Sequence, residues 1–68
     1  MSEAIADYTK AIENNPNFAN SYNNRAICYY QLKEYTKAWS DVHKAEELKY
    51  TVNPGFINAL RQASGMEQ

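Results

Sequence analysis

Residues 20–31 hold the side chains best suited to chemistry in this 68-residue chain. The segment carries Asn20, Asn23, Asn24, Arg25 and the single cysteine, Cys28. An amide both donates and accepts hydrogen bonds and can bind a peptide backbone, a guanidinium binds anions, and a thiolate is a nucleophile. Each of these functions needs partner residues at a defined spacing, so the rest of the sequence decides among them.

Neither Cys28 nor His43 has the neighbours that catalysis or metal binding requires. No histidine falls near Cys28 at helical spacing, so we expect a buried thiol and no nucleophilic catalysis. His43 is the single histidine, and a metal site would need further histidine or cysteine ligands, so a solvated role is favoured. The sequence also lacks a glycine-rich phosphate loop and paired carboxylates. We predict that the chain is not an enzyme and that it uses neither a metal nor another cofactor.

Composition argues against several classes of partner. The net charge is −1, whereas a nucleic-acid binder usually carries a basic surplus, and the six tyrosines are not interleaved with basic residues. No apolar run approaches the roughly 18 residues that a membrane span needs, and no secretory signal pattern opens the chain. A single cysteine fits a reducing compartment. We therefore expect a cytoplasmic protein that binds neither nucleic acid nor membranes.

A pattern that occurs twice predicts the architecture that positions these residues. Ala4, Asp7, Lys10, Ala11 and Glu13 recur 34 residues later as Ala38, Asp41, Lys44, Ala45 and Glu47. A period of this length is typical of stacked helical hairpins, in which each unit buries its apolar face on the next. The fold class that follows is all-α, an array of antiparallel helical hairpins.

Helical apolar spacing and sparse proline and glycine predict four helices. The expected helices cover residues 3–14, 19–32 and 35–49 and a fourth segment that begins at Pro54, with Ser2, Asn17 and Asn53 as N-caps and Gly65 as C-cap. Their expected inward stripes are Ile5, Tyr8, Ala11 and Ile12; Tyr22, Ala26 and Tyr29; Tyr35, Ala38, Val42, Ala45 and Leu48; and Phe56, Ala59, Leu60 and Ala63. The short connection at Lys33 and Glu34 makes its two helices antiparallel.

The joint spacing resembles the tetratricopeptide repeat, a 34-residue helix–turn–helix unit with the pattern W-x2-L-G-x2-Y…A-x3-F…P. The matching residues are Tyr22, Arg25, Ala26, Tyr29, Ala38 and Val42 in one repeat, Ala4, Tyr8, Ala11 and Pro16 in the half repeat before it, and Phe56 and Asn58 after it. The resemblance implies one domain, residues 1–68, with a half repeat at 2–16, a full repeat at 19–52 and a capping helix at 53–65. Lys33 departs from the pattern where glycine is usual, and Tyr50 replaces the proline that ends the repeat.

The resemblance implies a concave face, lined by the first helix of each repeat, that holds an extended peptide or a partner helix. Carried over by repeat position, this face consists of Asn20, Asn23, Asn24, Ile27, Tyr30 and Gln31. Asparagine is a poor helix former, so three in one helix favour a role in binding. Two alternatives stay open: the amides are merely solvated, or Ile27 and Tyr30 pack on the next helix rather than on a ligand.

Residues 22–26 are also similar to the Y-x-N-R-[SA] segment of tetratricopeptide domains that clamp a C-terminal carboxylate, as in cochaperones of heat-shock chaperones. In those domains an asparagine at the place of Asn24 donates to the carboxylate, and basic residues on flanking helices complete the clamp. Here the basic positions on the following helix correspond to Pro54 and Asn58, neither of which is basic. Since Asn24 alone cannot neutralise a carboxylate, a clamp is not favoured.

The predicted function is therefore a protein–protein interaction or scaffold module that binds a protein or peptide ligand. The alternative is a self-assembling structural fragment, because the first helix has an apolar flank with no covering helix, and exposed apolar area favours association. That alternative predicts a homo-oligomer formed through the N-terminal half repeat. We expect Arg25 to pair with a nearby acid and Trp39 to pack between helices.

Overall fold

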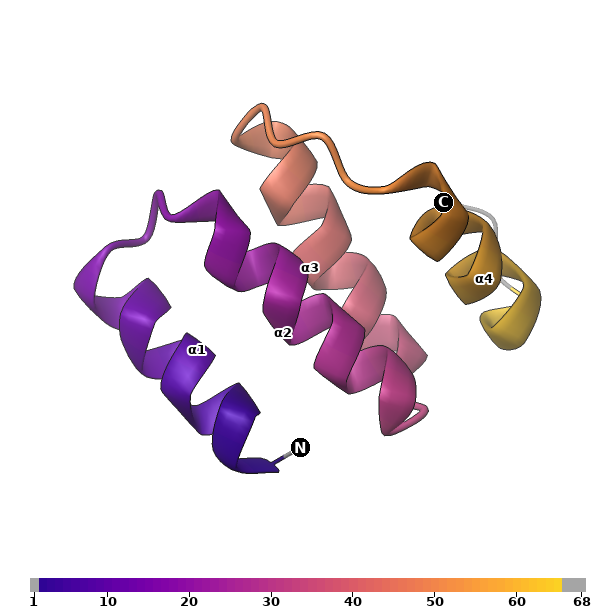
Figure 1. Ribbon diagram of the computed structural model, residues 1–68, viewed down its shortest axis with the longest axis horizontal. Coiled ribbons are helices and arrows are strands. Elements are labelled where there is room, and N and C mark those ends of the chain that lie inside the picture. Colours follow the sequence, from indigo (N-terminus) through magenta and orange to yellow (C-terminus); the bar gives the residue numbers. More distant parts are fainter. Residues whose placement is uncertain (1, 66–68) are drawn as a thin grey trace.

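The structure of the protein is a computed structural model that describes residues 2–65. Its helices are α1 (Ser2–Asn14), α2 (Ala19–Gln31), α3 (Tyr35–Glu47) and α4 (Pro54–Ser64). Figure 1 shows them in a row, with α1 and α4 at opposite ends and α2 and α3 between them. No strand forms within the described residues, and none of their helices is long and apolar enough to cross a membrane. The predicted all-α helical array is confirmed.

The ends of α4 follow the predicted local signals. Asn53 Oδ1 accepts a hydrogen bond from the Gly55 backbone N–H at 2.7 Å, and Pro54 is the first helical residue. Gly65 ends the helix with a φ of 69°, in the left-handed region that glycine adopts without a steric penalty. Both caps depend on short-range geometry, so the sequence is sufficient to predict them.

Three predicted helix ends are wrong. Ser2 lies inside α1 rather than capping it, and α3 ends at Glu47, two residues before the predicted end. Asn17 does not cap α2, because Phe18 occupies the N-cap position and no side chain caps that helix. The backbone N–H of Asn17 instead donates to Asn15 Oδ1 at 3.3 Å, so the asparagine pair shapes the preceding turn.

The turn between α2 and α3 stores backbone strain at Lys33, whose φ is 62°. A lysine in this region crowds its Cβ against the backbone, at a cost of about 1–2 kcal/mol. We expect Lys33→Gly to raise the free energy of unfolding by about 0.5–1 kcal/mol, because relief of strain outweighs the greater entropy of glycine in the unfolded chain. Urea denaturation followed by circular dichroism measures the change, and a lower urea midpoint would contradict the assignment of strain.

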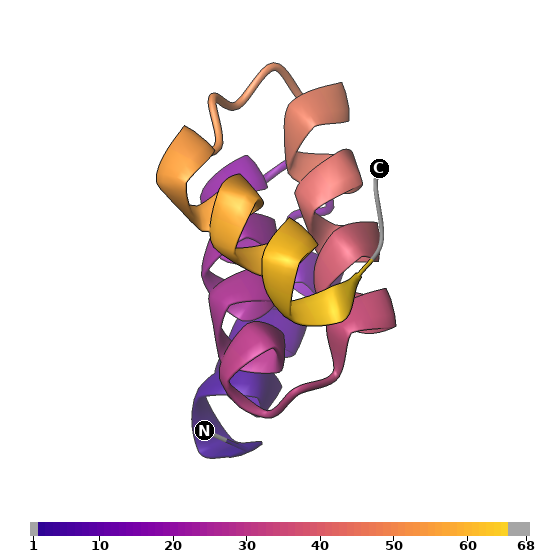
Figure 2. The same ribbon diagram turned by 90° about the vertical axis from the view of Figure 1, so that its right-hand side faces the viewer.

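The core lies between α2 and α3 and is closed by α4. Its residues with no exposed surface are Ala26, Ala38, Val42, Ala45 and Leu60. Alanines at these positions let the helix axes approach closely, while larger side chains fill the space between them. Figure 2 shows α4 crossing α3 obliquely, so its last turn reaches the beginning of α3.

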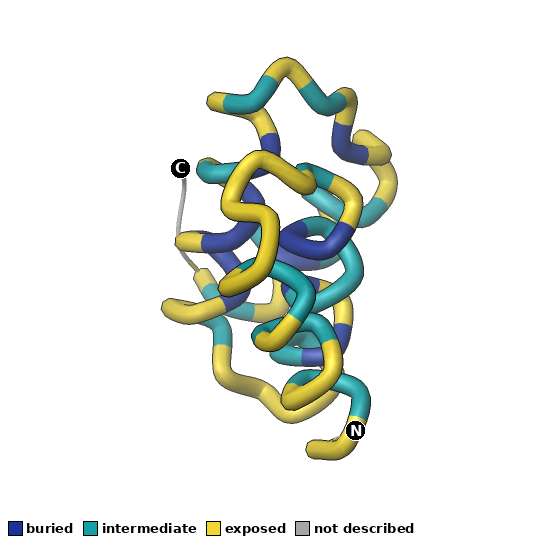
Figure 3. Tube along the Cα trace, turned by 90° about the vertical axis from the view of Figure 1, so that its left-hand side faces the viewer, coloured by how far each residue is buried: buried dark blue, intermediate teal, exposed yellow. Residues whose placement is uncertain are grey.

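The end helices are less well covered than the central pair. α1 has no buried residue, and its predicted stripe of Ile5, Tyr8, Ala11 and Ile12 is only half-buried. Figure 3 shows this end of the row with intermediate and exposed residues along α1. On α4, Ala63 is exposed, so the prediction that it faces inward is wrong. It lies on the side of α4 that no described helix covers.

Candidate functional site

The six residues predicted to bind a ligand lie along one side of α2, which we call the asparagine face. It consists of Asn20, Asn23, Asn24, Ile27, Tyr30 and Gln31. Their spacing of three or four residues places them on neighbouring turns of the same helix surface. Asn20, Ile27 and Gln31 are exposed, whereas the other three are half-buried. The face is therefore partly open to solvent and partly bordered by the next elements.

Two members of the face hold neighbouring elements. The Tyr30 ring contacts the ring of Phe56 on α4 edge-on at 5.6 Å between centroids, and that of Tyr35 at 6.1 Å. Tyr50, in the connection after α3, donates its hydroxyl to Asn20 Oδ1 at 3.5 Å. The structure thus supports the packing alternative for Tyr30, which joins α2 to α4.

The other amides of the face make no hydrogen bond within residues 2–65. The side chains of Asn23, Asn24 and Gln31 make no hydrogen bond to another described residue, and Ile27 is 36% exposed. Three amides beside one aliphatic side chain offer hydrogen-bond donors, acceptors and a small apolar contact. This arrangement can bind a polypeptide backbone together with one apolar side chain.

The face is electrically neutral. None of its six residues is charged, and Pro54 and Asn58 stand on α4 where a carboxylate clamp would carry basic residues. The one charged residue of α4 is Arg61, whose Nη1 donates to Asn58 Oδ1 at 3.0 Å. The geometry therefore suits neutral polar groups better than a free carboxylate.

Arg25 is used inside the fold, as predicted. Its Nε and Nη2 donate to the two oxygens of Asp41 on α3, both at 2.8 Å, and its Nη1 donates to Thr9 Oγ1 on α1 at 3.0 Å. The hydrogen bonds to Asp41 raise the pKa of Arg25 above its ordinary value, although burial opposes the shift. The guanidinium also lies 5.8 Å from the ring centres of Tyr22 and Tyr29. Arg25 ties three helices together rather than offering an anion site.

The remaining reactive side chains have structural surroundings. Cys28 is buried at 7% exposure, as predicted. Trp39 is 3% exposed, and its Nε1 donates to Ser64 Oγ on α4 at 3.2 Å, which confirms its packing role. His43 is exposed, also as predicted, and its ring lies 5.8 Å from that of Trp39. No group of three or more metal-binding side chains is found between residues 2 and 65.

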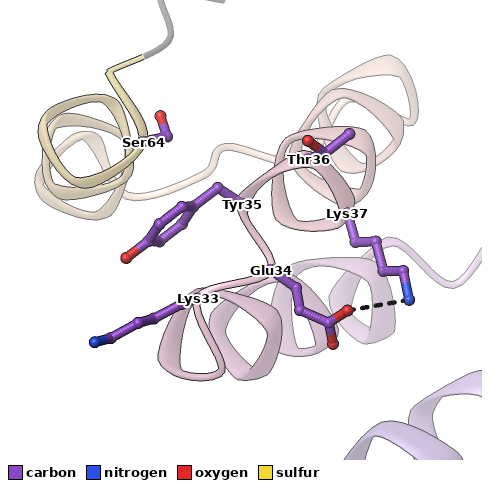
Figure 4. Close-up of a pocket in the computed structure, with 6 residues that line it drawn as sticks. All are labelled: Lys33, Glu34, Tyr35, Thr36, Lys37 and Ser64. Carbon is purple, nitrogen blue, oxygen red and sulfur yellow. Dashed lines mark ion pairs between the residues drawn. The ribbon is translucent and has the colours of Figure 1, made fainter.

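A hollow of about 360 Å³ lies where the α2–α3 turn meets the end of α4 (Figure 4). Its lining residues are Lys33, Glu34, Tyr35, Thr36, Lys37 and Ser64. Lys37 and Glu34 form an ion pair across 3.2 Å, and no buried polar side-chain atom of the described chain lacks a partner. Sequence reasoning did not find this hollow, because Ser64 comes from a helix far along the chain. Nothing in its lining indicates a ligand.

Antiparallel helices with a 34-residue period and an open polar helix face define the class of helical-repeat interaction proteins. Comparison with protein families agrees, because the tetratricopeptide repeat model matches residues 7–40. The chain belongs to the tetratricopeptide repeat family. This family generally serves protein–protein interaction.

Curated relatives carry the same repeat within much longer chains. The chain is 37% identical over 54 residues to Hsp70-Hsp90 organizing protein 3 of Arabidopsis thaliana and 42% identical over 53 residues to Hsp70-Hsp90 organizing protein 1 of Glycine max. These matches include 79% and 78% of this chain but only 10% and 9% of those proteins. The chain thus spans about a tenth of the length of these relatives. No solved structure matches it.

Proposed function

We propose that the chain binds an extended peptide segment of a partner protein through the asparagine face. The observation that carries the proposal is that the side chains of Asn23, Asn24 and Gln31 make no hydrogen bond in the described chain, beside Ile27, which is 36% exposed. In this proposal the amides bind the peptide backbone, and Ile27 contacts one apolar side chain of the peptide.

Helix propensity and neutrality support this mode of binding. Asparagine costs about 0.5–0.7 kcal/mol relative to alanine in a helix interior, so three in α2 weaken the helix unless they serve another purpose. Because the face carries no charge, recognition by hydrogen bonds and apolar contact accounts for it better than recognition by an ion pair. The bound segment is therefore proposed to be internal to its protein rather than a free C-terminus.

The relatives support a protein partner in general terms. Their names describe proteins that organize Hsp70 and Hsp90. Pro54 and Asn58 argue that this chain does not bind such a partner by neutralising a terminal carboxylate on α4. A chaperone-associated partner bound through an internal segment fits both observations.

The combined variant Asn24→Ala and Ile27→Ala should weaken peptide binding at least about tenfold while leaving the helical signal unchanged. Tyr30 is left intact, because its contact with Phe56 joins α4 to α2. The probe is a fluorescent peptide selected against the wild-type chain from a random display library, and fluorescence anisotropy gives its dissociation constant.

The matched control, Ser40→Ala with Glu46→Ala, changes two exposed residues of α3 and should bind as the wild type does. Amidating the C-terminus of the peptide and raising the salt concentration should each change the dissociation constant less than about threefold. Full binding by the Asn24/Ile27 variant would refute the proposed face, and a strict need for a free carboxylate would refute its neutral mode of recognition.

A further inference from the structure

The repeat relationship shows which surface α1 leaves uncovered. On α3 the residues Ala38, Val42 and Ala45 have no exposed surface, because α2 and α4 both pack near them. Their equivalents 34 residues earlier, Ala4, Tyr8 and Ala11, are all half-buried. Figure 3 views this end of the row directly. Within residues 2–65, α1 therefore lacks one of the two helices that cover its counterpart.

At the other end of the row, α4 also lacks a neighbouring helix among the described residues. α4 occupies the repeat position of α2, and α2 is followed by α3, which packs against it. Tyr29 on α2 packs against the core, whereas its equivalent on α4, Ala63, is exposed. In the described chain, α4 therefore stands at the position of a repeat's first helix but lacks the second helix of that repeat. α1 stands at the position of a repeat's second helix but lacks, within residues 2–65, the first helix of that repeat.

We propose that α4 of one copy packs against α1 of a second copy, as α2 packs against α3 within one chain. The side-chain sizes are complementary in this arrangement. Within the chain, the large Tyr29 shares a cluster with the smaller Val42. Between copies, the small Ala63 meets the large Tyr8, so the large and small positions are exchanged. Volume-conserving exchanges of this kind are the best tolerated in packed helices.

The polar residues at the junction are complementary too. Within one chain, Arg25 of α2 bridges Thr9 on α1 and Asp41 on α3. At the junction the residues 34 positions away take these places. Ala59 replaces Arg25 and His43 replaces Thr9 in the first copy, and Asp7 of the second copy replaces Asp41. Because Ala59 is much shorter than arginine, it leaves space in which the exposed His43 meets Asp7 of the second copy. A histidine–carboxylate contact then takes the place of the arginine bridge.

The two surfaces lie at opposite ends of the row (Figure 1), so the junction is head-to-tail. Such an interface uses different surfaces on the two partners and continues as an open series unless it closes into a ring. The wild-type chain is therefore expected to form a concentration-dependent series that extends beyond dimers. The asparagine face takes no part in the junction, so this inference is independent of the proposed peptide binding.

Two variants, each blocking one end, test the arrangement by sedimentation equilibrium. Ala4→Arg places a long side chain where the equivalent Ala38 has no free space, and Ala63→Arg places a long charged side chain on the exposed surface of α4. Each variant alone should associate about 10- to 100-fold more weakly than the wild type. An equal mixture retains one intact junction, between α4 of the first variant and α1 of the second. The mixture should therefore form a dimer and stop there.

The control Thr51→Arg adds the same charge at an exposed position in the connection between α3 and α4 and should associate like the wild type. If circular dichroism shows that Ala4→Arg lowers helix content, Asp7→Arg at an exposed position of α1 replaces it. A wild-type chain that stays monomeric over about a thousandfold range of concentration would overturn the proposal. Failure of the mixture to dimerise would overturn the head-to-tail arrangement as well.

Discussion

Asp41→Ala will lower the free energy of unfolding by about 3–5 kcal/mol, because it leaves the guanidinium of Arg25, whose side chain is only 17% exposed, without its carboxylate. Asp41 is 4% exposed and accepts two hydrogen bonds from Arg25 at 2.8 Å. The guanidinium also binds Thr9, so the loss is felt by α1, α2 and α3 together. A chain of this length has only about 3–10 kcal/mol of stability, so the variant should be largely unfolded. Urea denaturation followed by circular dichroism measures the change.

A double variant separates the cost of an unpaired charge from the value of the pair. Arg25→Met with Asp41→Leu removes both charges and keeps apolar volume, so it should recover most of the lost stability. Glu46→Ala removes an exposed carboxylate from the same helix and should change stability by less than about 0.5 kcal/mol. If Asp41→Ala costs no more than that control, the bridge does not hold the helices together.

The raised pKa of Arg25 fixes the sign of its pH dependence. A cationic group whose pKa is higher in the folded chain contributes stability below its unfolded pKa and loses that contribution as pH rises through the folded value. For Arg25 that window lies above the ordinary pKa of arginine. Arg25 therefore stays charged over the whole range in which unfolding is normally measured, and alkaline titration cannot replace the Asp41 variant.

Local sequence signals predicted the helices better than their ends. The Asn53–Pro54 start of α4 and its Gly65 end depend on atoms within a few residues, and both are confirmed. Asn17 carried the same kind of signal and failed, because Asn15 accepts from its backbone N–H and Phe18 occupies the cap position. When two asparagines lie within one turn, they can bond to each other's local backbone, so composition alone does not show whether either of them caps the helix.

Contacts between distant helices were harder to predict from the sequence than helix ends. The amphipathic arginine side chain predicted that Arg25 would pair with a nearby acid, but only the packing of α2 on α3 identifies Asp41, 16 residues away, as that acid. The asparagine face was placed by its repeat position in the family resemblance, whereas the contact between Tyr30 and Phe56 depends on where α4 lies. The exposure of Ala63 has the same origin, because the oblique crossing of α4 decides which of its alanines face inward.

Trp39→Ala will destabilise the chain by about 3–5 kcal/mol, and α4 should be the first element released. Trp39 is 3% exposed, shares the buried cluster with Leu60 of α4, and donates its indole N–H to Ser64 at 3.2 Å. Removing it leaves a large cavity and the loss of one interhelical hydrogen bond. Hydrogen exchange measured amide by amide should show faster exchange in α4 than in α2.

Two milder substitutions separate the contributions of the ring and of the hydrogen bond to the stability lost in Trp39→Ala. Trp39→Phe keeps an aromatic ring but cannot donate to Ser64, so it should cost less than the alanine variant by about 1–3 kcal/mol. His43→Ala removes the exposed ring beside Trp39 and should cost less than about 1 kcal/mol. If Trp39→Ala speeds exchange equally in α2 and α4, the two helices unfold as one unit, and α4 is not a separately docked element. Unequal exchange would show that α4, which carries the proposed junction, depends on Trp39 for its docking.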